Sequence, residues 1–210
     1  MVTRSGHVVS LIDPQPESID LFDIAHGLAH LCRFNGHTRR FYSVAEHSMH
    51  VARVAGFAAR SRTLGEVEQD GALDERAITQ QALLHDAAEA YLGDLIAPVK
   101  HFTRLGEAYE VLEDRLEAVI FAKFACPHPL DALVKGADKR VLAAELEQLM
   151  GVPPPAELGR PAGIRLAFHA RDQQLDWRGL FLRSAVRCGL AKWSDWIGPG
   201  SSPARLRQVA

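Results

Sequence analysis

The chain has 210 residues, a length that suits a single domain with a sizeable hydrophobic core. Its 24 basic and 26 acidic residues give a formal net charge of -2, and neither sign is gathered into a block. This composition argues against polymeric nucleic acid or a membrane surface as a partner.

Three cysteines, Cys32, Cys126 and Cys188, are scattered without the C-x-x-C spacing of a zinc knuckle. An odd, scattered set also argues against a disulfide framework, so we expect a cytoplasmic protein. The N-terminus lacks the apolar region of a signal peptide, and no run approaches the roughly 18 apolar residues of a membrane span. We therefore expect no membrane insertion.

The first segment, residues 1–17, contains the β-branched run Val8–Ile12 and a proline-bearing turn at 13–16. This pattern predicts a short strand or hairpin that forms an N-terminal appendage. Apolar residues at helical spacing then predict a helix over 23–33, which Asn35-Gly36 would stop.

Ser43-Val44-Ala45-Glu46 matches a capping box, which predicts a helix from there to about Arg60. The three-four apolar repeat of this helix includes His47, so we expect its imidazole to face inward and Glu46 to point elsewhere. The polar, glycine-bearing stretch 61–74 predicts an exposed loop.

A further helix is predicted over about 74–92, ended by Gly93. On it His85 and Glu89 lie one turn apart on an apolar face, and Asp86 lies on the adjoining stripe. Ionisable groups on a buried wall are costly unless something binds them. The pair His85-Asp86 therefore predicts a binding site.

After a loop at Pro98, amphipathic patterns predict helices over about 105–124, 130–150 and 175–189. In the second of these, Asp138 shares its inward face with Val134, Val141 and Glu145. With no repeat and no second domain visible, we predict an all-α, single-domain helical bundle, with a core over 18–150 and a helical extension over 151–210 that packs on it.

Four inward side chains from three helices, His47, His85, Asp86 and Asp138, form a nitrogen and oxygen donor set. Such a set suits one divalent transition-metal ion (Mn, Co, Fe, Ni or Zn) and leaves positions open for water and a substrate oxygen. Taken singly, a histidine such as His47 is more often a hydrogen-bonded core residue than a metal ligand. An aspartate such as Asp138 more often caps a helix or pairs with an arginine. Four together are harder to explain that way, because each unpaired buried charge costs several kcal/mol.

The order His47, His85-Asp86, Asp138 resembles the H...HD...D pattern of the HD-domain metal-dependent phosphohydrolases. The longer string from His85 to Lys100, with Gly93-Asp94 and Pro98-Val99-Lys100, is similar to the 5'-deoxynucleotidase branch of that superfamily. The resemblance extends over about 20–150. It implies an all-helical fold, the four residues as metal ligands, and a homodimer.

The resemblance also implies that Glu89 is catalytic and that Asp94 and Arg33 bind the nucleotide. Phe34 stands where the family has a tryptophan, and the spacing to His47 is shorter by one residue, which bears on sugar selectivity. The simpler alternatives are a helix-surface role for Glu89, a turn role for Asp94 and a helix-dipole partner role for Arg33.

Other basic and imidazole groups are secondary candidates. Arg39, Arg40 and Lys100 are expected as electrostatic recruiters of an anionic substrate or as surface residues. His50, one turn beyond His47, is a candidate partner of the metal ligands or a second-metal ligand.

The predicted function is hydrolysis of the phosphate ester of a small nucleotide, above all a 5'-deoxynucleoside monophosphate. Two alternatives stay open at this point: a deoxynucleoside triphosphate triphosphohydrolase, and a catalytically silent nucleotide-binding sensor. A cyclic-dinucleotide phosphodiesterase is disfavoured, because the Gly-Tyr-Pro extension of that branch is absent.

Overall fold

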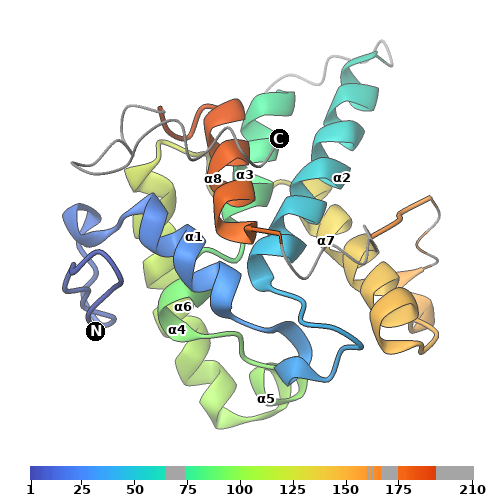
Figure 1. Cartoon of the computed structure of the whole chain (residues 1–210), viewed down its shortest axis with the longest axis horizontal. Coiled ribbons are helices and arrows are strands. Elements are labelled where there is room, and N and C mark those ends of the chain that lie inside the picture. Colours follow the sequence, from blue (N-terminus) through green and yellow to red (C-terminus); the bar gives the residue numbers. More distant parts are fainter. Residues whose placement is uncertain (65–73, 160, 162, 167–174, 193–210) are drawn as a thin grey trace.

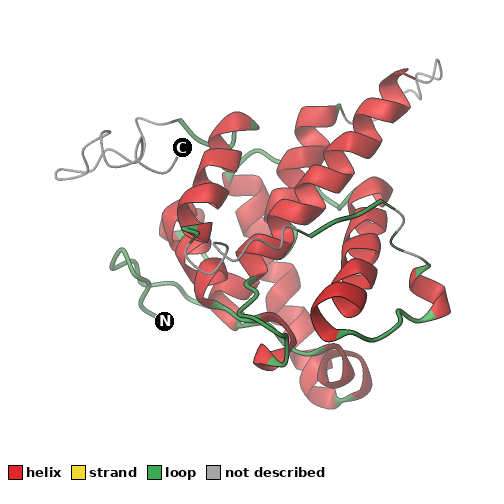
Figure 2. Ribbon diagram, turned by 45° about the vertical axis from the view of Figure 1, so that its right-hand side comes forward, coloured by secondary structure: helices red, strands yellow, loops and turns green. Residues whose placement is uncertain are grey.

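The computed structural model describes residues 1–64, 74–159, 161, 163–166 and 175–192. Over these residues the chain is a bundle of helices joined by loops, without a named strand (Figures 1 and 2). The helices are α1 (Leu21–His30), α2 (Val44–Leu64), α3 (Glu75–Leu84), α4 (Glu89–Leu92), α5 (Ala97–Phe102), α6 (Arg104–Lys123), α7 (Ala132–Glu145) and α8 (Trp177–Arg187). The predicted all-α fold is confirmed.

The N-terminal segment forms a turn rather than a strand. A single antiparallel bridge joins Val2 to Val8 across a turn at Gly6, and a 3-10 turn, η1 (Pro16–Ser18), follows. The strand predicted over 8–12 is therefore wrong, although the hairpin-like reversal is present. The buried carboxylate of Asp23 holds the turn on α1, where it accepts a hydrogen bond from the Ser5 amide at 2.8 Å.

The first two long helices begin at capping side chains. The Asp20 carboxylate accepts from the amides of Phe22 and Asp23, so α1 starts and ends slightly earlier than predicted. At the start of α2, the Ser43 hydroxyl accepts from the Glu46 amide at 3.1 Å, which is one half of the expected capping box. Glu46 does not complete the other half, and its side chain is fully buried instead of pointing outward.

The predicted helix over 74–92 is interrupted at the His85-Asp86 pair. α3 ends at Leu84, and the amides of Ala87, Glu89 and Ala90 bond to carbonyls three residues back. This is the tighter 3-10 winding, in which side chains three positions apart are eclipsed. α4 then resumes at Glu89 and ends at Gly93, whose φ of 85° suits glycine.

The segment at Pro98, expected to be a loop, is the short helix α5, because proline is tolerated in the first turn of a helix. α7 ends earlier than predicted and passes into a π-helical turn, η3 (Leu146–Met150). Most of the loop predicted over 61–74 lies outside the described residues, and α2 extends to Leu64.

The core is built around α2, which packs against α3, α7, α1 and α8, while α6 covers η1 and α5 (Figure 1). α1 approaches α4 closely: a Cβ on Gly27 would lie 2.9 Å from the Cβ of Ala90. None of the described helices is long and apolar enough to cross a membrane.

Candidate active site

The imidazole of His47 lies at the centre of the site. Its side chain is fully buried on α2, and its Nε2 is 3.3 Å from His85 Nε2, 3.2 Å from Asp138 Oδ1 and 3.5 Å from Asp86 Oδ2. His85 Nε2 is in turn 3.2 Å from Asp86 Oδ1 and 4.0 Å from Asp138 Oδ1. The structure thus brings together all four residues predicted from the three helices.

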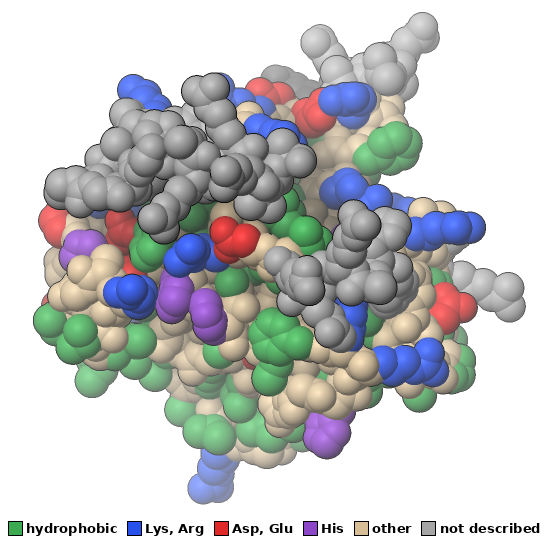
Figure 3. Space-filling model, in the orientation of Figure 1, with side chains coloured by type: hydrophobic (Ala, Val, Ile, Leu, Met, Phe, Trp, Pro, Cys, Tyr) green, Lys and Arg blue, Asp and Glu red, His purple; other side chains and the backbone are tan. Residues whose placement is uncertain are grey.

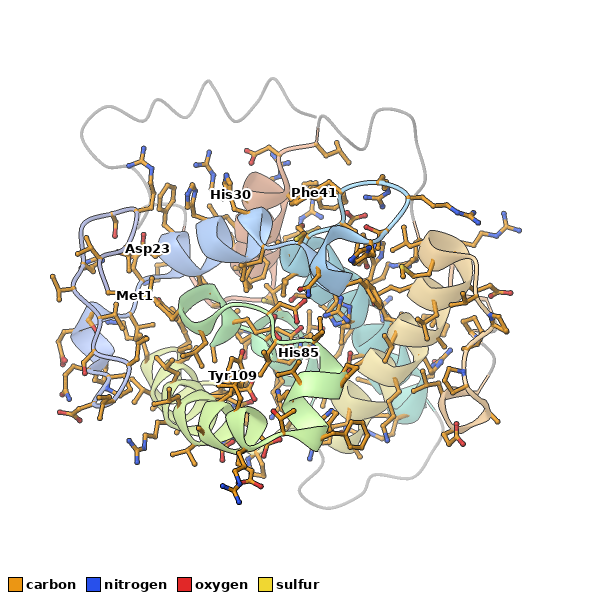
Figure 4. The ribbon with its side chains drawn as sticks, turned by 90° about the horizontal axis from the view of Figure 1, so that it is seen from below. Met1, Asp23, His30, Phe41, His85 and Tyr109 are labelled. Carbon is orange, nitrogen blue, oxygen red and sulfur yellow. The ribbon has the colours of Figure 1, made fainter. Side chains whose placement is uncertain are left out.

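His47, His85 and Asp86 offer ligand atoms that all lie within 4.8 Å of one another, close enough to share one metal ion, and Asp138 adjoins this group through His47. Ligand atoms about 2.1 Å from one ion at right angles lie about 3 Å apart, close to the observed 3.2–4.0 Å. The two imidazoles are buried, whereas the Asp86 and Asp138 side chains are 18% and 40% exposed. The carboxylate side of the cluster is therefore open to solvent. His85 lies in the middle of the molecule in Figure 4.

The remaining ring nitrogens of both histidines have fixed partners. His47 Nδ1 lies 2.6 Å from Glu145 Oε1, and His85 Nδ1 lies 2.9 Å from the carbonyl oxygen of Ala82. Both acceptors require a proton on Nδ1, which leaves the Nε2 lone pairs directed at the cluster. Such partners are typical of metal-binding histidines.

Glu145 was predicted to share the face of Asp138 but not to belong to the site. It is fully buried, and besides His47 it accepts from the Tyr42 hydroxyl at 2.8 Å and from Arg33 Nη2 at 3.2 Å. Burial alone would raise its pKa, but Arg33, His47 and Tyr42 outweigh burial and hold the pKa at about 2. Its position seven residues after Asp138 was the available sequence signal.

The proton on His47 competes with a metal. Burial and Arg33 lower the pKa of His47, but Glu145 and Asp138 prevail and raise it to about 9. The pKa of Asp138 lies below its usual range, because contacts with His47 and His85 outweigh burial. A divalent ion would occupy the place of that proton, as is general for metal sites built from histidine.

Glu89 stands apart from these pairs. Its side chain is buried, and its Oε2 has no hydrogen-bond partner among the described residues. Burial, followed by the charges of Asp86 and Asp94, raises its pKa well above the usual value. Because of the 3-10 turn, Glu89 lies on the same side of the helix as Asp86, three residues earlier. This position explains why the charge of Asp86 raises the pKa of Glu89.

The three predicted substrate-binding residues border the same cluster. Arg33 Nη1 is 3.6 Å from Asp86 Oδ2, and its guanidinium lies 5.6 Å from the centre of the Phe34 ring. Phe34 has a φ of 55° within the turn η2 (Arg33–Gly36). Asp94 follows α4, and its pKa is raised by burial and by Asp86 although Arg33 lowers it.

Two of the expected electrostatic recruiters are engaged elsewhere. Arg40 donates to the buried Glu46 at 2.8 Å, so its expected surface role is wrong. Lys100 donates to Glu113 at 2.5 Å. His50 Nε2 lies 3.8 Å from Glu46 Oε1, so this imidazole neighbours the Arg40–Glu46 ion pair rather than His47.

The all-α bundle, with two histidines and two aspartates converging from three of its segments, has the architecture of an HD-domain protein. Residues 21–139 match the family described as 5'-deoxynucleotidase YfbR-like. Because this match covers more than half of the chain, the protein belongs to that family.

Similar proteins extend the match along the chain. An uncharacterized protein of Rhodobacter capsulatus is 37% identical over 195 residues, which cover 81% of this chain and 92% of the relative. The uncharacterized YfdR of Escherichia coli is 36% identical over 133 residues, covering 63% of this chain and 62% of YfdR. The 5'-deoxynucleotidase YfbR of Salmonella newport is 35% identical over 99 residues, covering 42% of this chain and 47% of that enzyme.

Proposed function

We propose that this protein is a metal-dependent phosphohydrolase that removes the phosphate from a small 5'-deoxynucleoside monophosphate. The observation that carries the proposal is Glu89, a buried carboxyl with a raised pKa beside four convergent metal-type donors. Perturbed carboxyls next to such a cluster are typical of acid-base catalysis. Membership of the 5'-deoxynucleotidase YfbR-like family supports the substrate class.

The four predicted ligands, His47, His85, Asp86 and Asp138, would hold one divalent ion of the Mn, Co, Fe, Ni or Zn type. When bound, such an ion lowers the pKa of a coordinated water and neutralises charge on a phosphoryl oxygen. Glu145 keeps the Nε2 of His47 available, since its Oε1 accepts a hydrogen bond from the Nδ1–H of that imidazole.

The chain's own groups supply the remaining needs of ester hydrolysis. Glu89, whose pKa is raised by burial and by Asp86 and Asp94, donates its proton to the departing 5'-oxygen of the sugar. The guanidinium of Arg33, beside Asp86, binds the phosphoryl oxygens through its planar array of donors. Asp94 accepts a hydrogen bond from a sugar hydroxyl, and the Phe34 ring packs against the sugar without the polar N–H of an indole.

A monophosphate is favoured over a triphosphate by the distribution of cations. Arg33 brings one guanidinium to the donor cluster, whereas Arg40 and Lys100 pair with Glu46 and Glu113. The intact Glu89, whose Oε2 has no hydrogen-bond partner within the described part of the chain, disfavours a silent nucleotide sensor, because a sensor has no use for a buried acid.

Phosphate release from deoxynucleoside mono-, di- and triphosphates with Mn or Co tests the proposal. We expect turnover of the monophosphates, with inorganic phosphate as product. Release of tripolyphosphate from the triphosphates would instead identify a triphosphohydrolase. If protein that holds an ion shows no turnover with any metal, the catalytically silent nucleotide-binding sensor is the remaining alternative.

Asp138→Ala tests the ligand set separately from turnover. We expect the variant to lose its metal, as measured by elemental analysis after dialysis. Asp114→Ala, which removes an exposed carboxylate on α6, is the matched control. Unchanged metal content in Asp138→Ala would remove this residue from the site. The proposed homodimer and cytoplasmic location stay predictions, the first open to sedimentation analysis.

A further inference from the structure

A cavity lies on the surface of α1, and its lining includes none of the four proposed metal ligands. It has a volume of about 780 Å³, which falls in the range of about 300–1,000 Å³ typical of small-molecule sites. Figure 4 places His30 and Phe41 at one edge of the molecule, while His85 lies in its middle. The lining side chains that matter here are Arg4, His26, His30, Phe41, Trp177 and Arg178.

Four basic side chains from three segments line this cavity. His26 and His30 lie one turn apart on α1, with ring centres 4.1 Å apart, and Arg178 lies in the first turn of α8. Figure 3 shows two adjacent histidine side chains over α1 with basic side chains beside them. Arg4 is carried by the N-terminal turn, which Asp23 fastens to α1 through the Ser5 amide.

The basic groups in the cavity lining outnumber its acid, Asp176. The Asp176 carboxylate caps α8 by accepting from the Gly179 amide at 3.0 Å, and its Oδ1 lies 3.9 Å from Arg178 Nε. The buried Nδ1 of His26 has no hydrogen-bond partner among the described residues. Burial, then His30, Arg178 and Arg4, lower the pKa of His26, as expected where positive potential accumulates.

The cavity also offers aromatic surface. Phe41 is 52% exposed, and Trp177 is half-buried at the start of α8. The guanidinium of Arg178 lies 5.2 Å from the centre of the Phe22 ring, which stacks on His26. This contact and the Asp176 carboxylate, 3.9 Å from Nε, orient the planar guanidinium of Arg178 beside the imidazoles.

We propose that this cavity is a second ligand site, which binds a small phosphorylated molecule that carries an aromatic ring, such as a nucleotide. The phosphate lies between Arg178, His26 and His30, and the ring packs against Phe41 and Trp177. His30 keeps its Nδ1 hydrogen bond to the His26 carbonyl at 2.7 Å, so its Nε2 is the ring nitrogen that meets the phosphate.

Calorimetric titration of the metal-loaded protein with a nucleoside 5'-phosphonate tests this site. The probe carries both the ring and the dianion but no hydrolysable ester. We expect two binding events, one of which Arg178→Gln weakens about tenfold or more, because one charge-assisted hydrogen bond is lost. The exposed His30→Gln should weaken the same event, and Arg187→Gln, at the other end of α8, should change neither.

The outcomes separate this site from the active site. An event lost in Arg178→Gln supports the second site even if the other event or turnover is absent. A single event that neither Arg178→Gln nor His30→Gln affects would overturn the proposal. The unphosphorylated nucleoside and inorganic phosphate serve as separate probes. Equal affinity for the nucleoside and the phosphonate would overturn the anionic part of the assignment.

Discussion

Two buried glutamates flank the donor cluster, and their surroundings are opposite. Glu145, at the end of α7, contacts Arg33, His47 and Tyr42, and these partners hold its pKa at about 2. Glu89, at the start of α4, has an oxygen without a partner among the described residues, and burial with two neighbouring acids raises its pKa well above the usual value.

The difference shows how one residue type serves two roles in one site. A fully paired carboxylate is fixed in charge and position, so it can orient a ligand but cannot exchange protons near neutral pH. An unpaired carboxyl in an apolar, acidic setting keeps its proton and can deliver it. The partners of each glutamate therefore predict whether its substitution changes turnover or changes stability and metal affinity.

The largest expected effect is on turnover in Glu89→Gln. The amide keeps the shape of the side chain but cannot donate an acidic proton, so we expect kcat to fall by about 10² to 10⁴ while metal content is unchanged. Phosphate-release kinetics and elemental analysis measure the two quantities. Glu110→Gln, on the exposed face of α6, is the matched control. Normal turnover in Glu89→Gln would remove the proposed acid.

Glu145→Gln should act on stability and metal affinity instead. The neutral amide removes the nearer of the two carboxylates that pair with the buried Arg33, which we expect to lower the free energy of unfolding by about 3 kcal/mol. Metal affinity should fall about 10- to 100-fold, because Nδ1 of His47 loses a charged acceptor. Denaturant unfolding and metal titration measure these changes, with the exposed Glu147→Gln as control. A variant that binds metal normally would contradict the orienting role.

The two glutamates should also give opposite pH dependences of stability in metal-free protein. The folded-state pKa of Glu89 is raised from 4.5, so its contribution is fully present below 4.5 and is lost as the pH rises through the folded-state pKa. Glu89→Gln should therefore gain thermal stability relative to the wild type as the pH rises above 4.5. For Glu145, lowered to about 2, the contribution is present above 4.5 and is lost as the pH falls through 2. Parallel pH profiles for the two Gln variants would show that their surroundings do not differ in this way.

The smallest expected effect is that of Tyr42→Phe. The ring still fills its fully buried position, and Glu145 keeps Arg33 and His47, so only one hydrogen bond is lost. We expect a loss of about 1 kcal/mol in unfolding free energy and almost unchanged kcat. A loss as large as that of Glu145→Gln would mean that Tyr42, rather than Arg33, is the main partner of the carboxylate.

The sequence predicted the parts of the molecule that depend on local pattern. Periodic apolar residues located α1, α2, α6, α7 and α8, and inward spacing was enough to collect His47, His85, Asp86 and Asp138. Their convergence was expected from this spacing together with the H...HD...D resemblance, and the structure leaves the side chains of Asp86 and Asp138 partly exposed.

The features that escaped prediction depend on partners distant in the chain or on small changes of winding. Glu145 meets Arg33 and His47, which are 112 and 98 residues away, so its place on the inward face of α7 did not reveal its partners. The 3-10 turn at His85 has the same sequence pattern as an α-helix, because the two windings differ by less than one residue per turn. Arg40 has the sequence context of a surface cation, but in the fold it donates to the buried carboxylate of Glu46.

That 3-10 turn makes the candidate active site a joint between two helices with separate supports. α3, which leads to His85, rests on α2, whereas α4, which carries Glu89, rests on α1 where Gly27 meets Ala90. The position of the Glu89 carboxyl relative to the proposed ligands His85 and Asp86 is therefore set by two different helix contacts. A methyl group added at Gly27 would shift one support and not the other, so the reach of the acid can be tuned from a residue that touches neither substrate nor metal.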